Sequence, residues 1–281
     1  MAETILKWAG SKRSILPQLE RLITRERLIG HRYYEPFIGS GALAFDLEYP
    51  ATVINDLNSE LVNVYNVVKS NVNALVDSLS YLQANHSQNL FYELRELDRN
   101  PRFTEIHSDL ERAARTIYLN KTCFNGLYRV NSKGQFNTPM GRTTNGTTPD
   151  IVQEEKLREL SRVLQTFEIR NVSYREACQD AQEGDVLYFD PPYASFPDSE
   201  SFTAYQADGW TDEDLIELKH FCDELVDRGC LVVVSNNGTP FVKELFTDDR
   251  YEIEEISVRR SISCNSESRK KVEEVIIHGG R

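Results

Sequence analysis

The sequence has little of what marks a secreted, membrane or metal-binding protein. Its 281 residues include only five cysteines, which are scattered and never spaced as Cys-x-x-Cys. This pattern predicts free thiols in a reducing, cytoplasmic compartment, and it argues against disulfides or a zinc site. No apolar run approaches the roughly 18 residues that a membrane-spanning helix needs, and the first residues lack the layout of a signal peptide. We therefore expect a soluble protein that binds no metal and is a monomer in solution.

The net charge of −12 is unusual for a protein that binds nucleic acid, but the charge is unevenly distributed. The windows 7–32, 112–149 and 257–271 hold 18 basic and three acidic residues, whereas the rest of the chain holds 14 basic and 41 acidic residues. A protein with one basic surface and an acidic exterior elsewhere would bind phosphates in a single orientation. The alternative is that these Lys and Arg side chains only solvate helix faces.

The order of strands and helices predicts an α/β protein whose sheet is interrupted by an inserted lobe. Strand-like segments at 33–38 and 52–54 flank a helix, and this β-α-β beginning predicts a parallel sheet. Helical periodicity follows from 59 to about 121, then a polar segment at 122–149 with a hairpin turning near 131–134. Strand-like runs return at 186–189, 231–234 and 275–277, with a helix at about 211–228. We predict a catalytic domain at 1–59 and 150–281 and a recognition domain at 60–149, which holds the acid-free basic window.

Two features near the first strands predict a site for a nucleotide-like ligand. The segment Glu35-Pro-Phe-Ile-Gly-Ser-Gly41 stands between a strand and a helix, where its two glycines let the backbone turn tightly and approach a ligand. Asp56 ends the next strand, where a carboxylate can accept hydrogen bonds from ribose hydroxyls. Alternatively Asp56 is a helix N-cap, a role that Asn58 or Ser59 could fill instead.

The N-terminal segment combines an aromatic ring, a turn and two cations in Lys7-Trp8-Ala-Gly-Ser-Lys12. A tryptophan is more often a core residue than a ligand platform. Because two lysines flank Trp8 closely, a platform for adenine with a cation for a carboxylate is the better interpretation.

The most informative stretch is Asp190-Pro191-Pro192-Tyr193, directly after the hydrophobic run at 186–189. Its prolines fix a rigid, extended loop that can present the Asp190 carboxylate and the Pro191 carbonyl as acceptors. An exocyclic amine is a poor nucleophile because its lone pair is delocalised into the base. Two acceptors on its N–H groups favour the tetrahedral nitrogen that attacks a methyl sulfonium, and Tyr193 offers an aromatic face to a flipped base. An ordinary Pro-Pro loop with a capping Asp would not explain the tyrosine.

In their order along the chain, these motifs resemble the Dam-type DNA adenine N6-methyltransferases, the D12 class with the α order of motifs. The resemblance rests on the segments 7–12, 35–41, 55–58, 124–129, 135–142, 190–193, 201–203 and 259–263. It implies a Rossmann-like, S-adenosylmethionine-dependent methyltransferase sheet with an inserted, mostly helical DNA-recognition lobe that carries a β-hairpin. It also implies methylation of adenine in double-stranded DNA, in the cytoplasm of a bacterial or phage-infected cell.

The resemblance also implies a role for each matching residue. The catalytic residues would be Asp190, Pro191 and Tyr193. S-adenosylmethionine, with S-adenosylhomocysteine as product, would contact Trp8, Lys12, Phe37, Gly39, Gly41, Asp56 and Asp190. DNA would contact Lys7, Phe124, Asn125, Arg129, Pro139 and Arg142, with Lys7 reading the first base of the site and Phe124 entering the space near the flipped base. Together Lys7, Asn125 and Arg129 favour GATC or a longer site that contains GAT.

The sequence departs from the family pattern at two of these motifs. Ser11 stands where a second glycine is usual, and Phe124 where a tyrosine is frequent, which keeps an apolar wedge without the hydroxyl. The nearest alternatives are methylation of cytosine N4 or of a protein glutamine, although Ser or Asn commonly begins the tetrapeptide in those families. A catalytically idle DNA-binding homologue is the third alternative, and the intact Asp190 and Tyr193 weigh against it.

Overall fold

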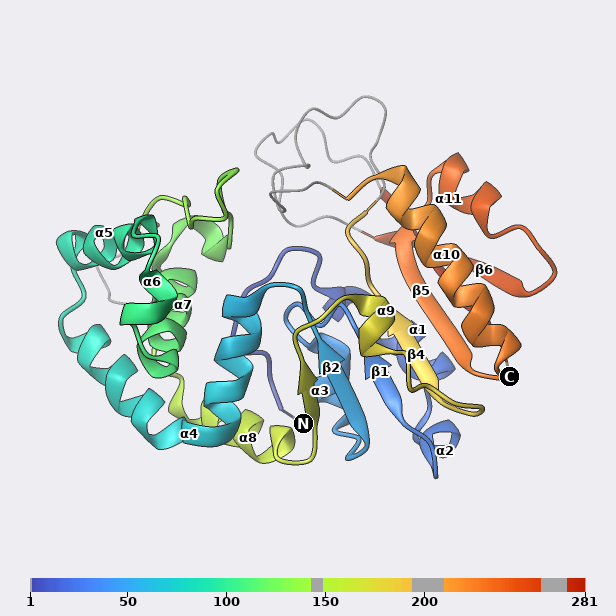
Figure 1. Cartoon of the computed structure of the whole chain (residues 1–281), viewed down its shortest axis with the longest axis horizontal. Helices are drawn as coiled ribbons and strands as arrows, with labels where there is room; N and C mark the ends of the chain where they lie inside the picture. Colours follow the sequence, from blue (N-terminus) through green and yellow to red (C-terminus); the bar gives the residue numbers. More distant parts are fainter. Residues whose placement is uncertain (1, 143–148, 194–209, 259–271, 281) are drawn as a thin grey trace.

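The computed structural model describes residues 2–142, 149–193, 210–258 and 272–280, and it shows a mixed sheet with a helical lobe beside it (Figure 1). The sheet has seven strands in the order β3-β2-β1-β4-β5-β7-β6. They are β1 (Tyr33–Glu35), β2 (Thr52–Asn55), β3 (Glu168–Arg170), β4 (Val186–Phe189), β5 (Leu231–Asn237), β6 (Tyr251–Val258) and β7 (Val272–Gly279). The predicted α/β class is confirmed. The expected parallel pairing holds for β1 to β5, whereas β7 runs antiparallel to both β5 and β6.

The order of the parallel strands reverses between β1 and β4. From β1 the chain adds β2 and then β3 on one side, and it returns to place β4 and β5 on the other. Such a reversal leaves a crevice at the carboxyl ends of the two central strands, which is where open α/β sheets bind ligands. Any ligand site of this sheet is therefore expected beyond Glu35 and Phe189, the last residues of β1 and β4.

Each face of the sheet has its own hydrophobic core, because successive strand residues point to opposite sides. Tyr33 and Tyr188 belong to one core, whereas Tyr34 and Leu187 belong to the other. The first core is covered by the short 3-10 helix η1 (Lys12–Ile15), α1 (Leu16–Leu22), α2 (Arg25–Leu28), α3 (Ala42–Leu47), the first half of α4 (Ser59–Ala84) and α8 (Glu154–Leu164). The second is covered by α9 (Tyr174–Ala177), α10 (Asp212–Asp227) and α11 (Pro240–Leu245).

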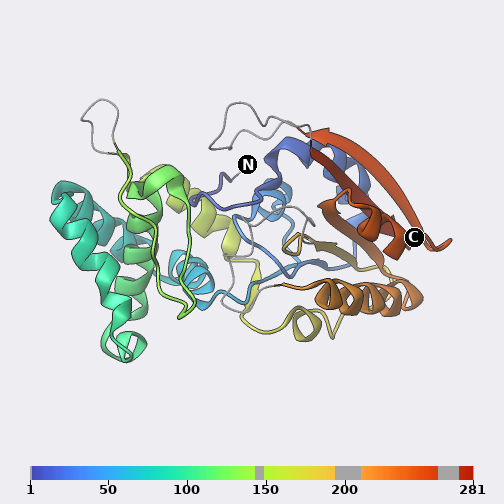
Figure 2. The same ribbon diagram turned by 90° about the horizontal axis from the view of Figure 1, so that it is seen from above.

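Helix α4 connects the sheet to the lobe (Figures 1 and 2). The Asn58 side chain caps it by accepting from the Leu61 N–H at 3.1 Å, so the N-cap is Asn58 and not Asp56. The helix leaves helical geometry at Asn71 and then continues into the lobe. There it is joined by α5 (Gln88–Glu96), a 3-10 turn η2 (Leu97–Arg99), α6 (Phe103–Ile106), α7 (Asp109–Thr122) and a 3-10 turn η3 (Phe124–Gly126). The expected hairpin forms around an antiparallel bridge between Val130 and Phe136.

One hydrophobic core runs without interruption from the sheet into the lobe. Leu75, Phe91 and Tyr118 of the lobe belong to the same cluster as Tyr33 of β1. The domain boundaries at 60 and 149 remain a prediction, and this shared core indicates that the lobe is packed against the sheet rather than tethered to it.

Part of the basic windows is structural. Arg115 is only 4% exposed, forms an ion pair with Asp98 at 2.8 Å and donates to the Leu94 carbonyl, and Arg112 pairs with Glu60. The window 257–271 falls almost wholly outside the described residues, as do the motif segments 201–203 and 259–263. Cys123, Cys178, Cys222 and Cys230 are buried free thiols, and Cys264 lies outside the described residues. Among the described helices, none has the length and apolarity needed to cross a bilayer.

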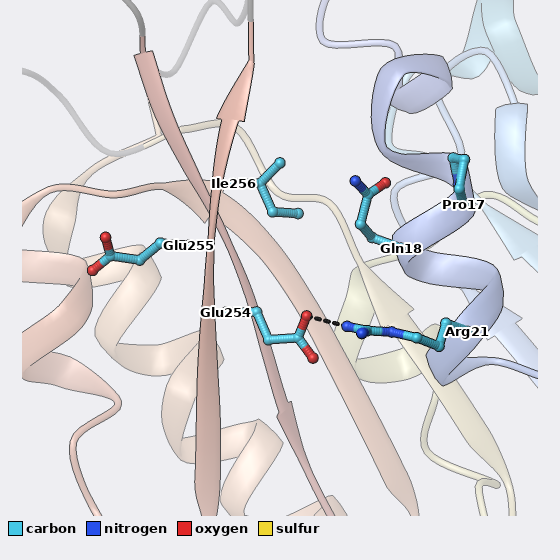
Figure 3. Close-up of a pocket in the computed structure, with 6 residues that line it drawn as sticks. All are labelled: Pro17, Gln18, Arg21, Glu254, Glu255 and Ile256. Atoms are coloured by element: carbon cyan, nitrogen blue, oxygen red, sulfur yellow. Dashed lines mark hydrogen bonds and ion pairs between the residues drawn. The ribbon is translucent and has the colours of Figure 1, made fainter.

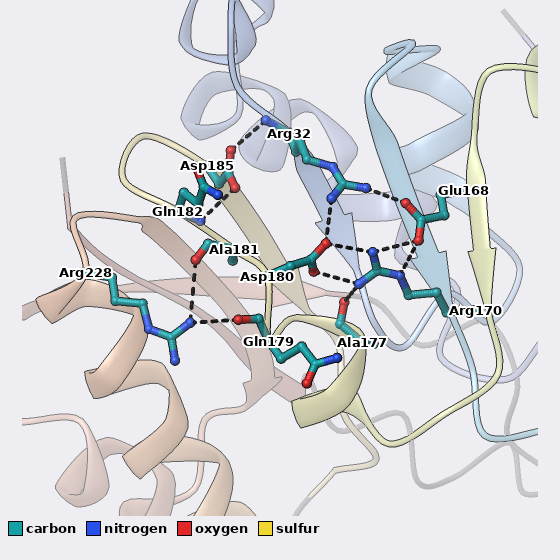
Figure 4. A network of polar contacts seen from close by, with 10 residues as sticks. All are labelled: Arg32, Glu168, Arg170, Ala177, Gln179, Asp180, Ala181, Gln182, Asp185 and Arg228. Carbon is teal, nitrogen blue, oxygen red and sulfur yellow. Dashed lines mark hydrogen bonds and ion pairs between the residues drawn. The ribbon is translucent and has the colours of Figure 1, made fainter.

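Two open hollows have none of the predicted site residues in their lining. One, of about 600 Å³, lies between α1 and β6, where Arg21 pairs with Glu254 (Figure 3). The other, of about 490 Å³, lies beside β3 and α9. Its wall is part of an ion-pair network in which Arg170 bridges Glu168 at 2.6 Å and Asp180 at 2.7 Å (Figure 4). This network ties β3 to the connection between α9 and β4.

Candidate active site

Asp190 lies at the crevice, on the first residue after β4. The strand register pairs Phe189 with Val234, so the residues that follow, Asp190 and Ser235, lie side by side on neighbouring strands. The Ser235 hydroxyl donates to Asp190 Oδ1 at 2.8 Å, and it lies 2.8 Å from the hydroxyl of Tyr188. Ser235 and Tyr188 are buried. The start of the predicted Asp190–Tyr193 loop is thus held by the buried hydroxyl groups of Ser235 and Tyr188.

Lys12 approaches the same carboxylate from the N-terminal segment. Its Nζ lies 2.7 Å from Asp190 Oδ1 and 2.8 Å from Oδ2, and it also donates to the Gly10 carbonyl at 2.6 Å. The Lys12 ammonium lies 4.9 Å from the centre of the Tyr193 ring, a distance at which a cation and an aromatic face attract. Burial raises the pKa of Asp190, while Lys12 and the hydrogen bond from Ser235 oppose that rise.

A second buried carboxyl group, Glu35, lies at the end of β1. It is 3% exposed and accepts a hydrogen bond from the Tyr33 hydroxyl at 2.8 Å. Burial raises the pKa of Glu35 to about 8, the Tyr33 hydrogen bond opposes this, and the nearby Asp190 adds to it. Glu35 is therefore mostly neutral at pH 7, which leaves Asp190 without a second full negative charge at close range.

The glycine-rich turn after β1 closes against Asp56 and Trp8. Gly39 and Gly41 both have positive φ (48° and 71°), which a side chain would strain. A Cβ on Gly39 would come 3.0 Å from the Trp8 ring, so any larger residue would also require that ring to shift. Asp56 accepts from the Gly39 N–H at 3.1 Å, and Tyr65 of α4 donates to the Gly39 carbonyl at 2.6 Å. Burial raises the pKa of Asp56, and hydrogen bonds from backbone N–H groups oppose that rise.

Aromatic rings stand on two sides of this turn. Trp8 stacks on Tyr128 of the lobe with ring centroids 4.8 Å apart. Phe37 instead packs into the second core, stacked on Tyr174 at 5.6 Å and edge-on to Trp210 at 5.6 Å. The structure therefore brings Trp8, but not the ring of Phe37, against the lobe, and the predicted cofactor roles of both stay predictions.

The predicted DNA-contacting residues of the lobe lie on the segment between α7 and residue 142. Phe124 is 47% exposed, and its N–H donates to the Pro139 carbonyl at 2.9 Å, which brings these two residues together. Asn125 is exposed and has a left-handed φ of 56°. The Nε of Arg129 donates to Asn137 Oδ1 at 2.7 Å, so one edge of its guanidinium is fixed.

Lys7 joins this segment from the other end of the chain. Its side chain lies on Gly126, where a Cβ would overlap the Lys7 side chain. The amide of Asn120 hydrogen-bonds the backbone of both Lys7 and Gly126. Lys7 is exposed, as is Arg142, the last described residue before the gap at 143–148.

Sequence reasoning missed several residues that complete the site. Ser235 had a usable signal, because it follows the apolar run 231–234 just as Asp190 follows 186–189, and parallel strands end at one edge. Asn120 and Tyr128 had none, since a single polar or aromatic residue in these segments does not reveal its partner. In the described ranges, no three His, Cys, Asp or Glu side chains come together as a metal site would require.

The strand order and the crevice between β1 and β4 are those of an open, Rossmann-like α/β sheet, and they agree with the fold of S-adenosylmethionine-dependent methyltransferases. Within that class, residues 8–262 match the model of the D12 class N6 adenine-specific DNA methyltransferases. The chain belongs to this family and is a DNA adenine methyltransferase. Membership decides for adenine over the cytosine N4 and protein glutamine acceptors considered above.

Individual relatives agree over nearly their whole length. The Type II methyltransferase M1.LlaDCHI of Lactococcus lactis subsp. cremoris is 39% identical over 273 residues, which cover 96% of this chain and 93% of that protein. The Type II methyltransferase M.MjaIII of Methanocaldococcus jannaschii is 35% identical over 279 residues, 94% of each chain. The DNA adenine methylase of Escherichia coli (strain K12) is 31% identical over 273 residues, 96% of this chain and 93% of that protein.

Proposed function

We propose that this enzyme transfers the methyl group of S-adenosylmethionine to N6 of an adenine that is flipped out of double-stranded DNA, within GATC or another site containing GAT. The observation that carries the proposal is the Asp190 carboxylate, held at the crevice by Lys12 and Ser235 on a loop braced by two prolines. A carboxylate fixed in this way is an acceptor that needs no reorganisation when an amine arrives.

The chemistry of the crevice residues fits S-adenosylmethionine. Asp56 Oδ2 accepts from the Gly39 N–H and Oδ1 from the Asn58 N–H, and the carboxylate, which also interacts with the Leu57 N–H, retains a lone pair for a ribose hydroxyl. Trp8 is held by Tyr128 as an aromatic wall suited to an adenine ring. Lys12 places a positive charge at the crevice that would attract a methionine carboxylate, while its N–H groups donate to Asp190 and to the Gly10 carbonyl. When bound, the cofactor supplies the methyl sulfonium on which the reaction depends.

The chain's own part in the reaction is to hold the amine and take up its positive charge. Asp190 Oδ1 accepts from both Ser235 and Lys12, whereas Oδ2 accepts from Lys12 and keeps a lone pair for an N–H of adenine. The Pro191 carbonyl is the second acceptor, and Tyr193 stacks on the flipped base. Methylation places a positive charge on N6, and loss of one N6 proton toward the Asp190 carboxylate restores a neutral amine.

The lobe supplies sequence recognition. Nε and one terminal nitrogen of Arg129 donate to Asn137, at 2.7 and 3.5 Å, and the remaining terminal N–H groups form the fork that would match O6 and N7 of guanine. Exposed Phe124 is suited to fill the space left by the flipped adenine. Lys7 reads the first base of the site, and Asn125, Pro139 and Arg142 contact neighbouring bases or phosphates.

Replacing Asp190 tests the catalytic assignment. We expect Asp190→Ala to lower the rate of methyl transfer by about a thousandfold or more, with much of the DNA affinity retained. Asp190→Asn keeps the shape of the side chain and separates chemistry from folding, and Asp249→Ala replaces an exposed carboxylate as the matched control. Wild-type rates in both Asp190 variants would refute the assignment.

Mapping the methylated bases tests two points together: the DNA sequence that the enzyme recognises, and whether the protein is instead a catalytically idle homologue. The wild-type protein is incubated with S-adenosylmethionine and DNA of mixed sequence, and modified adenines are located by single-molecule sequencing. Methylation confined to sites that contain GAT supports the proposal. Methylated adenines outside such sites would refute the recognition sequence, and cofactor binding without methylation of any duplex would identify an idle homologue.

A further inference from the structure

We propose that Asn120 is a positioning residue for sequence discrimination, because its buried amide fixes the backbone of Lys7 against the recognition turn at 124–126. The inference rests on the proposed function, in which Lys7 reads the first base of the site. Asn120 lies in the last turns of α7, in the lobe, whereas Lys7 belongs to the N-terminal segment that leads to the crevice.

The amide of Asn120 has a partner for each of its polar groups. Its Oδ1 accepts from the Lys7 N–H at 3.0 Å, and its Nδ2 donates to the Lys7 carbonyl at 2.8 Å. The second N–H of Nδ2 donates to the Gly126 carbonyl at 3.1 Å. The side chain thus pairs with Lys7 as a neighbouring β-strand would, and Asn120 is only 1% exposed. A buried, fully satisfied amide of this kind specifies one arrangement of the groups it joins.

Packing reinforces the same alignment. Gly126 has a left-handed φ of 67°, and the Lys7 side chain lies across it so closely that a Cβ would overlap. The next residue, Trp8, stacks on Tyr128 two positions beyond Gly126. Three contacts therefore hold the N-terminal segment against the recognition turn and the residues that follow it. They are the Trp8–Tyr128 stack, the Lys7 side chain on Gly126, and the hydrogen bonds of the Asn120 amide.

The alignment matters because a lysine alone discriminates poorly. Its ammonium is a flexible point charge on four methylenes, and it contributes to base specificity only if its backbone is fixed relative to the other base-reading groups. Asn120 fixes that backbone to the turn that carries Phe124 and Asn125. Without it, we expect Lys7 to keep its attraction for DNA and to lose its fixed position relative to the bases.

The test compares two buried asparagines that differ in what they hold. Asn120→Ala removes the three hydrogen bonds at Lys7 and Gly126. Asn63→Ala is the matched control, since Asn63 of α4 is also buried and donates to a backbone carbonyl, that of Asp109, far from the recognition turn in sequence. Asn120→Ser replaces the amide with a single hydroxyl and provides a milder variant for the case in which the alanine variant does not fold.

Methylation rates are measured on duplexes that carry each of the four bases at the first position of the site mapped for the wild-type protein. We expect Asn120→Ala to reduce the ratio of kcat/KM between the correct and incorrect first base roughly tenfold, with Asn120→Ser in between. Discrimination at the remaining positions is expected to change less. Asn63→Ala is expected to lower thermal stability and leave the ratio at its wild-type value.

Lys7→Ala and the double variant separate the inference from the function on which it rests. If Lys7→Ala loses first-base discrimination and the double variant loses no more, Asn120 acts through Lys7. If Lys7→Ala loses it while both Asn120 variants keep it, the inference is overturned and the proposed role of Lys7 stands. If Lys7→Ala itself retains full discrimination, the role of Lys7 and the inference both fail.

Discussion

We expect Ser235→Ala to reduce the catalytic activity that depends on Asp190, because the change acts on the support of this carboxylate rather than on a proposed contact to DNA or cofactor. The change removes the 2.8 Å hydrogen bond to Asp190 Oδ1 and leaves the buried Tyr188 hydroxyl without its 2.8 Å partner. A hydrogen bond to a charged group contributes about 1.5–3 kcal/mol, so we expect a loss of unfolding free energy of that order and a decrease in kcat of roughly tenfold or more. Because the Ser235 hydrogen bond lowers the pKa of Asp190, its removal raises that pKa further. The acid limb of the kcat profile should therefore move to higher pH.

The assay is the initial rate of methyl transfer at saturating DNA and cofactor, measured across pH for the wild type and three variants. Ser235→Thr keeps a hydroxyl and should keep the wild-type acid limb. Tyr188→Phe removes the tyrosine hydroxyl but retains the bond from Ser235 to Asp190, so it should lower stability and leave the acid limb near its wild-type position. If Ser235→Ala loses stability while its acid limb coincides with that of the wild type, Ser235 does not act on Asp190 and the reasoning is refuted.

Three further predictions follow from the geometry of the crevice. Gly41→Ala should destabilise the protein by well over the roughly 1–2 kcal/mol that a left-handed backbone costs, because its Cβ would overlap an aromatic ring of α3. Gly134 has a similar φ of 73° but open space around it, so Gly134→Ala should cost only the backbone strain. Equal melting temperatures for the two variants would refute this prediction. Glu35 has its folded pKa raised to about 8, so its contribution to stability is lost as pH rises from about 4.5 to 8. Urea unfolding at pH 5 and pH 8 should then show a smaller loss of stability for Glu35→Gln than for the wild type, and parallel losses would count against the shift. Tyr128→Ala should weaken cofactor binding by roughly two- to tenfold, since a stacked aromatic pair contributes about 0.5–1.5 kcal/mol; calorimetry showing unchanged affinity would mean that Trp8 needs no support from the lobe.

The central strands could be predicted from sequence because strands buried on both faces read as apolar runs. Val186–Phe189 coincides with β4, and the run 231–234 forms most of β5. The edge strands could not be found in this way. β3 is Glu168–Arg170, whose charged ends enter the ion pairs of Figure 4, and β6 carries charged residues along its length. The insertion of β7 between β5 and β6 depends on pairing, which no local pattern records.

The same contrast holds for the site. Asp190 and the glycine turn belong to short motifs whose spacing reflects a strand ending at a ligand, so they are visible in the sequence. Ser235, Asn120 and Tyr128 act through partners tens of residues away, and only the folded chain brings them to Asp190, Lys7 and Trp8. The motifs predict the reacting groups, and the structure adds the residues that contact them.

The stack of Tyr128 on Trp8 limits how specificity can be exchanged between related enzymes. A chimera that takes residues 60–149 from a relative would receive that relative's side chain at position 128, and a residue other than an aromatic there would remove the stack on Trp8, the proposed wall for the cofactor's adenine. We expect such a transplant to succeed only when the N-terminal segment around Lys7 and Trp8 is carried over with the lobe. Under the proposed roles of Lys7 and Trp8, an exchange of the lobe alone would alter methyl-donor binding together with DNA recognition.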